Sequence, residues 1–199
     1  MRLRYELQMK NEQEIILIAA MSENRVIGKD NTMPWSIKGN LAHFKEMTMG
    51  WPCVMGRRTW ESLPKKPLPG RLNIIISKTM DSKILTQRHE DTEMNKRSKD
   101  NNISSSAPPR EILIFSSLTS AIDYCADYEK IFICGGESIY RQALPLANRI
   151  DLTLIHGQYE GDTFFPDIDE TCWIKTNTAG FDEYSIISYI KNKTTKEQL

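Results

Sequence analysis

A continuous apolar run, Ile15-Ile16-Leu17-Ile18-Ala19-Ala20, stands near the start of the chain. A strand that is covered on both faces carries apolar residues at consecutive positions, whereas a surface strand alternates apolar and polar residues. The run therefore predicts a central strand of a buried sheet. Four further short apolar runs predict additional strands of that sheet, and they span residues 52–56, 73–77, 112–115 and 131–134.

Helical spacing of apolar residues occurs between the predicted strands. It is clearest at Leu118, Ala121, Ile122, Cys125 and Ala126. Ser117 precedes this stripe and is the expected N-cap. Strands that alternate with helices predict an α/β fold with a mainly parallel central sheet and helices on both faces. From Ile150 to Tyr189, strand-like runs follow one another without a helix, so we expect an antiparallel C-terminal edge.

The length of 199 residues is enough for one well-buried domain and short for two. The 26 basic and 26 acidic side chains balance, so no net charge directs the chain toward nucleic acid or a membrane surface. We expect one domain over residues 14–191, an N-terminal extension over 1–13 and a C-terminal tail over 192–199. Residues 80–110 are rich in Lys, Asp, Asn, Ser and Pro, and are expected to form a polar insertion.

The potential soft metal ligands are scattered along the sequence. They are Cys53, Cys125, Cys134, Cys172, His43, His89 and His156. Their spacing is not that of structural zinc or of a disulfide framework, so we expect neither. Thiols within apolar runs indicate a reducing, intracellular setting. Because no stretch has the length of a membrane span or the form of a signal peptide, we expect a cytoplasmic protein.

Two glycine segments stand where a predicted strand gives way to a helix: Gly56-Arg57-Arg58-Thr59 and Gly135-Gly136. A helix N-terminus offers N–H groups and a positive dipole end to an anion, and glycine lets the backbone approach a phosphate. Two such segments on one sheet fit the phosphates of a dinucleotide, although the Gly-x-Gly-x-x-Gly fingerprint is absent. Taken singly, the first also fits a solvated arginine pair, and the second fits a plain strand-to-helix turn.

The stretches around these glycines resemble the dihydrofolate reductase family in their order and spacing. The resemblance runs from about Ile15 to Ile190 and is interrupted by the polar insertion. It rests on Ile18-Ala19-Ala20, Arg25-Val26-Ile27-Gly28, Met33-Pro34-Trp35, Val54-Met55-Gly56-Arg57, Thr59-Trp60-Glu61-Ser62, Pro67-Leu68-Pro69-Gly70-Arg71, Gly135-Gly136 with Tyr140, and Glu160-Gly161-Asp162-Thr163.

The resemblance implies a single-domain reductase in tetrahydrofolate biosynthesis and one-carbon metabolism. NADPH would donate a hydride to C6 of the pterin, converting 7,8-dihydrofolate to 5,6,7,8-tetrahydrofolate, and antifolates would inhibit the reaction. We expect a monomer with no metal and no partner in nucleic acid or membrane. The family also joins its glycine pair by a cis peptide, which we expect between Gly135 and Gly136.

The resemblance also implies roles for individual residues. The expected NADPH contacts are Ala20, Ile27, Gly56, Arg57, Arg58, Thr59, Ser77, Lys78, Gly135, Gly136, Glu137, Ser138, Ile139, Tyr140 and Thr163. The expected substrate contacts are Ile18, Asn40, Leu41, Phe44, Leu63, Leu68, Arg71, Cys134, Tyr140 and Thr153. The expected catalytic residues are Met33, Trp35, Asn40 and Thr153, with Met33-Pro34-Trp35 in a loop that closes over the nicotinamide.

Several of these residues have a plainer interpretation. Pro34 and Trp35 also suit ordinary loop packing, and the helical spacing of Leu41 and Phe44 also suits a core face. Arg71, expected to pair with the α-carboxylate of the glutamate tail, would otherwise be an unpaired surface side chain. The match of residues 67–71 as a block favours the functional interpretation.

The chain departs from the family pattern at Asn40, five residues after Trp35. Bacterial members carry aspartate there and vertebrate members carry glutamate. An amide cannot supply the charge that would favour a protonated pterin, and neither Glu46 nor Asp30 is placed to replace it. We therefore expect slow reduction at neutral pH that accelerates as the pH falls, with Thr153 bridging Asn40 and the ligand and solvent supplying the proton.

Two other functions remain compatible with the sequence. One is a non-catalytic homologue that binds NADPH or a folate, and the other is a related reductase of another pterin or a pyrimidine. The tail-binding arginine in the block at 67–71 argues against the second.

Overall fold

The computed structural model describes residues 13–37, 40–79 and 112–192. The expected polar insertion and nearly all of the expected N-terminal extension and tail lie outside these residues. The strands are β1 (Glu14–Ser22), β2 (Val26–Gly28), β3 (Cys53–Gly56), β4 (Asn73–Ile76), β5 (Ile112–Phe115), β6 (Lys130–Ile133), β7 (Arg149–Ile155), β8 (Thr163–Phe164), β9 (Trp173–Gly180) and β10 (Tyr184–Lys191). The helices are α2 (Asn40–Thr48), α3 (Arg57–Ser62), α4 (Leu118–Tyr124) and α5 (Glu137–Ala143).

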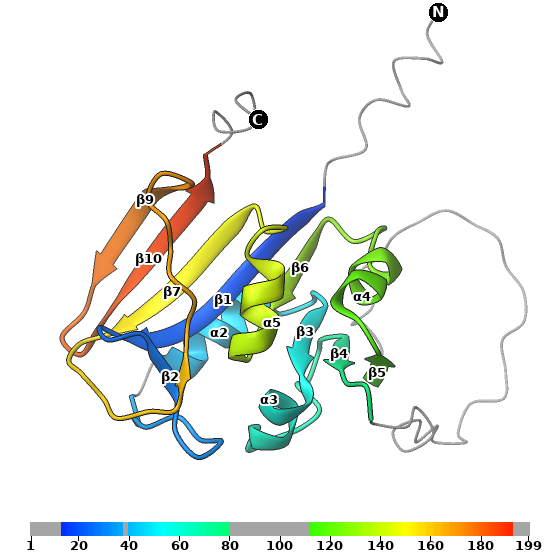
Figure 1. Cartoon of the computed structure of the whole chain (residues 1–199), viewed down its shortest axis with the longest axis horizontal. Coiled ribbons are helices and arrows are strands. Elements are labelled where there is room, and N and C mark those ends of the chain that lie inside the picture. The colour runs from blue at the N-terminus through cyan, green and yellow to red at the C-terminus, as the bar shows by residue number, and fades with distance from the viewer. Residues whose placement is uncertain (1–12, 38–39, 80–111, 193–199) are drawn as a thin grey trace, which may run out of the picture.

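Eight strands form one sheet in the order β5-β4-β3-β6-β1-β7-β10-β9 (Figure 1). The strands from β5 to β7 are parallel, and β10 and β9 run antiparallel at the C-terminal side. The expected α/β fold with an antiparallel edge is confirmed. Each predicted strand is present within one or two residues, because consecutive apolar residues suit strands that are buried on both faces.

The two faces of β1 belong to different cores. Leu17 and Ala19 pack with residues of α4 and α5, whereas Ile16 and Ile18 pack with Phe44 of α2. Figure 1 shows α4 and α5 on the near side of the sheet and α2 behind it. The expectation of helices on both faces is therefore confirmed.

Two local details differ from the sequence expectation. Helix α4 begins as expected, with Ser117 accepting from the backbone N–H of Ser120, but it ends at Tyr124 rather than at Ala126. β8 leaves the main sheet and pairs with β2 in a separate two-stranded sheet. No helix in the described ranges is long and apolar enough to cross a membrane.

Candidate functional site

The two glycine segments meet at one edge of the sheet because β3 and β6 are parallel neighbours. Helix α3 begins directly after Gly56, and α5 begins directly after Gly136. The backbone N–H of Gly56 donates to the carbonyl oxygen of Gly135 over 2.7 Å. The Gly135-Gly136 peptide is cis, as expected. The two strand-to-helix turns therefore form one continuous backbone surface.

The side chain of Thr59 lies against this surface and leaves little room for a side chain at either glycine. A Cβ at Gly135 would stand 3.3 Å from Thr59 Oγ1, and one at Gly136 would stand 3.1 Å from the same oxygen. Gly135 also has a φ of 123°, which residues with a side chain rarely adopt. The result is a polar cradle of backbone and one hydroxyl, defined by Gly56, Thr59, Gly135 and Gly136. A phosphate can approach it closely.

Cationic side chains lie beside the cradle. Arg57 donates from Nη1 to Thr79 Oγ1 over 3.1 Å, which joins the start of α3 to the segment after β4. That segment contains Ser77 and Lys78, and both Lys78 and Arg58 are exposed. The structure therefore gathers the arginine pair, Ser77 and Lys78 at one end of the cradle.

The other expected cofactor contacts surround the start of α5. Ile139 and Tyr140 are buried, and the Tyr140 hydroxyl donates to the carbonyl oxygen of Ile18 over 2.7 Å. Burial raises the pKa of this phenol well above its ordinary value, so it remains a hydrogen-bond donor at neutral pH. Ser138 is exposed on the first turn of α5.

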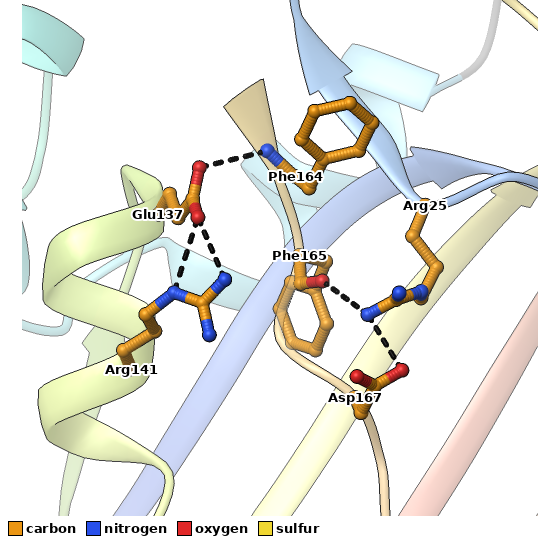
Figure 2. A network of polar contacts seen from close by, with 6 residues as sticks. All are labelled: Arg25, Glu137, Arg141, Phe164, Phe165 and Asp167. Carbon is orange, nitrogen blue, oxygen red and sulfur yellow. Dashed lines mark hydrogen bonds and ion pairs between the residues drawn. The ribbon is translucent and has the colours of Figure 1, made fainter. Parts of the chain in front are cut away.

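Glu137 ties α5 to β8, as Figure 2 shows. Its Oε2 accepts from the backbone N–H of Phe164 over 3.1 Å, and its Oε1 accepts from Arg141. These hydrogen bonds, the Phe164 one first, lower the pKa of Glu137. On the far side of β8, Arg25 donates to the carbonyl oxygen of Phe165 and pairs with Asp167 at 2.6 Å. Thr163 is thereby held near the cradle end of α5.

A group of apolar side chains, called the apolar slot below, lies on the α2 face of the sheet. Phe44 and Cys134 both pack against two buried clusters, one that contains Ile18 and one that contains Leu68 and Trp60. Leu63 also packs against the second cluster. Burial raises the pKa of the Cys134 thiol well above its ordinary value, and a hydrogen bond with Cys53 adds to this effect. Leu41, by contrast, is 57% exposed at the start of α2.

Arg71 is buried at the end of the slot, with only 4% of its surface exposed. Its Nη1 donates to Thr48 Oγ1 over 3.0 Å, its Nε donates to the carbonyl oxygen of Pro69 over 3.1 Å, and its guanidinium lies 5.8 Å from the Phe44 ring centre. The alternative of a surface arginine is therefore wrong. Within the described ranges no carboxylate forms an ion pair with Arg71, although buried charges are normally paired.

The loop that contains Met33 and Trp35 packs beside the β2–β8 sheet, where Trp35 contacts a cluster that contains Val26 of β2. Trp35 is buried and meets Tyr159 edge to face at 5.4 Å, whereas Met33 is 47% exposed. The Nε1 of Trp35 is buried and has no hydrogen-bond partner, which is unusual for an indole N–H. Ala20 packs on the same cluster, and Ile27 packs on the α4–α5 side.

Asn40 is the first residue of α2, but the placement of its side chain lies outside the described part of the structure. Thr153 is buried in β7, in register with Ala20 of β1 and Ile186 of β10. No group of three or more His, Cys, Asp or Glu in the described ranges is placed to hold a metal ion.

Sequence reasoning overlooks one buried acid on this face, Asp151. It is 2% exposed and stands two residues before Thr153 in β7. The sequence spacing could have revealed Asp151, because residues two apart in a strand lie on the same face.

Comparisons with known proteins agree with this geometry. The family model described as dihydrofolate reductase matches residues 14–107 and 98–193. A dihydrofolate reductase of Neisseria gonorrhoeae is 42% identical over 160 residues, covering 80% of this chain and 83% of that protein. One of Bacillus subtilis is 33% identical over 189 residues, covering 92% and 97% respectively. The solved structure of the Enterococcus faecalis dihydrofolate reductase, complexed with NADP(H) and RAB-propyl, is 28% identical with a TM-score of 0.70, covering 90% of this chain and 97% of that one.

Proposed function

This chain belongs to the dihydrofolate reductase family and is an oxidoreductase, and we propose that it reduces 7,8-dihydrofolate to 5,6,7,8-tetrahydrofolate with NADPH. The observation that carries the proposal is a phosphate cradle beside an apolar slot that ends at Arg71, which is buried and has no carboxylate partner among the described residues. We further propose that it works as a cytoplasmic monomer and that antifolates inhibit it.

The residues of the cradle fit a phosphorylated nicotinamide dinucleotide. The exposed backbone of Gly135 and Gly136 beside the Thr59 hydroxyl suits a pyrophosphate held by backbone N–H groups and Thr59. Arg57, Arg58 and Lys78 would surround a 2′-phosphate, since guanidinium groups bind phosphate oxygens in pairs. This arrangement favours NADPH over NADH.

When bound, NADPH supplies the hydride that reduces C6 of the pterin. The protein would position the two reactants and exclude water. Ala20 and Ile27 would contact the nicotinamide half, and the loop with Met33 and Trp35 would cover it. The Nε1 of Trp35 fits this role, because it is a buried donor with no acceptor in the described part of the chain.

On the substrate side, Phe44, Leu63 and Leu68 would pack the flat rings of the folate, and Ile18 and Cys134 would line the floor. Leu41 would lose its exposure when a ligand covers it. Arg71 would pair with the α-carboxylate of the glutamate tail, since its planar fork matches a carboxylate and a buried guanidinium needs an anion. This buried arginine favours a folate over a tail-less pterin or a pyrimidine.

Asn40 and Thr153 would bind the pterin amide and amino groups without supplying charge. A charge-assisted hydrogen bond contributes about 1.5–3 kcal/mol, against about 1 kcal/mol for a neutral one. The difference corresponds to roughly one or two decades in rate if it acts only in the transition state. Slow turnover at neutral pH, with a proton taken from solvent, follows from this comparison.

A steady-state assay of NADPH consumption tests the proposal. With purified protein, we expect consumption that depends on dihydrofolate and that is much slower with NADH. NADPH binding without turnover at any pH would favour the non-catalytic alternative. Turnover with a tail-less dihydropterin as efficient as with dihydrofolate would favour a different substrate.

A further inference from the structure

Asp151 occupies the middle of β7, where a charged side chain is unexpected. The strand lies between β1 and β10 (Figure 1), so both of its edges are paired. The side chain of Asp151 is 2% exposed. Acidic side chains are almost never this buried unless they are paired or functional, and the rest of the face around Ile16 and Ile18 is apolar.

Two donors contact one oxygen of the carboxylate. The Ser188 hydroxyl donates to Oδ1 over 2.8 Å, and Arg149 Nε donates to the same oxygen over 2.9 Å. Arg149 Nη2 lies 2.9 Å from Oδ2, yet Oδ2 accepts no hydrogen bond. That distance makes an ion-pair contact.

The register of β7 places this carboxylate beside the substrate slot. Asp151 is opposite Ile18 of β1, and Thr153 is opposite Ala20. Residues i and i+2 of a strand are about 6.6 Å apart and lie on the same face. Asp151 is therefore about 6.6 Å from Thr153 along β7, on the same face. Ile18 and Thr153 are both expected pterin contacts. Asp151 is therefore on the same face of the sheet as Ile18, the face that α2 covers.

We propose that Asp151 supplies, through space, the negative charge that Asn40 cannot supply. The inference rests on the proposed function and extends it. A negative charge beneath the pterin favours the form with a proton on N5. Solvent supplies that proton, NADPH supplies the hydride to C6, and the products are tetrahydrofolate and NADP⁺.

The other charged groups on this face also influence whether N5 of the pterin carries a proton. Arg149, on the same strand, opposes the charge of Asp151. Ile18 of β1 and Ser188 of β10 are uncharged. The titratable side chain of α2 nearest this face is His43, which stands one turn before Met47, and Met47 packs on the Ile16 cluster. Removing the acid and removing its arginine should therefore act in opposite directions.

The test measures the hydride-transfer rate by stopped flow across pH, with NADPH and its 4-deuterated form, for Asp151→Asn and Arg149→Met. We expect Asp151→Asn to slow hydride transfer roughly tenfold at neutral pH, to move the pH profile to lower pH and to leave NADPH binding unchanged. Arg149→Met should move the profile to higher pH. Asp123→Asn, which removes an exposed charge from α4 on the other face, is the matched control.

A second measurement keeps the inference testable if either variant is destabilised. In the Asn40→Asp background, which restores a charge at the slot, Asp151→Asn should change the rate less than twofold. An equal loss in both backgrounds, or losses of the same sign for Asp151→Asn and Arg149→Met, would show that the ion pair only stabilises β7. If the unmodified chain does not oxidise NADPH with dihydrofolate at any pH, the proposed function itself has failed.

Discussion

The backbone N–H of Gly56 lies 2.7 Å from the carbonyl oxygen of Gly135, which joins two strand-to-helix turns that are 79 residues apart in the sequence. The link exists because β3 and β6 are parallel neighbours that end at the same edge of the sheet. Neither turn alone would hold a dinucleotide. Together the two turns form the cradle, and the backbone of the cradle is open to a ligand because its glycines carry no side chains.

Replacing Gly136 with alanine should weaken NADPH binding at least tenfold. The added Cβ would stand 3.1 Å from Thr59 Oγ1, so either the threonine or the ligand must move. Quenching of tryptophan fluorescence by NADPH measures the affinity. Gly180→Ala is the matched control, because a Cβ there meets nothing within 4 Å. Equal affinities for the two variants would contradict the proposed cradle.

Replacing Arg71 with methionine should raise the KM for dihydrofolate while leaving kcat within a fewfold. The lost charge-assisted contact is worth about 1.5–3 kcal/mol, or roughly 10- to 100-fold in KM. Steady-state kinetics with dihydrofolate and with a dihydropterin that lacks the glutamate tail separate the two effects. The KM of the tail-less substrate should not change. A similar rise for both substrates would mean that Arg71 only shapes the slot.

Replacing Glu137 with glutamine should destabilise the fold at neutral pH by less than about 1 kcal/mol, because the carboxylate is partly exposed and such contacts are weakened by solvent. The pKa of Glu137 is lowered in the folded protein. Its contribution is therefore present above the ordinary pKa of a glutamate and is lost as the pH falls through the lowered value. Urea unfolding at pH 7 and pH 4 should show a difference that shrinks in acid. The exposed Glu183→Gln variant should show no such trend.

The apolar runs made the sheet predictable, because a short run of consecutive apolar residues such as Ile16 and Leu17 indicates a strand that is buried on both faces. The pairing of β8 with β2 was not predictable, since two residues carry no periodicity. The burial of Arg71 also depends on Thr48, a residue 23 positions away. The two-residue spacing between Asp151 and Thr153 predicts that both side chains lie on one face of the strand. The burial of Asp151 also depends on β10, and the local sequence pattern does not show that β10 pairs with β7.

The missing charge at Asn40 predicts a further effect on inhibitors. Diaminopteridine antifolates bind this family as protonated rings, and a neutral amide cannot pair with that charge. Asn40→Asp should tighten their binding by roughly tenfold, as measured by inhibition at neutral pH. Unchanged inhibition would mean that another group, such as Asp151, already serves as the ionic partner.

The most direct measurement is the rate of NADPH oxidation with dihydrofolate from pH 5 to pH 8, for the unmodified chain and for Asn40→Asp. We predict that the unmodified chain is slow at neutral pH and accelerates in acid. Asn40→Asp should be roughly ten times faster at pH 7 and converge with the parent at low pH. A parent rate that does not depend on pH, or an Asn40→Asp variant that is no faster at pH 7, would contradict this account.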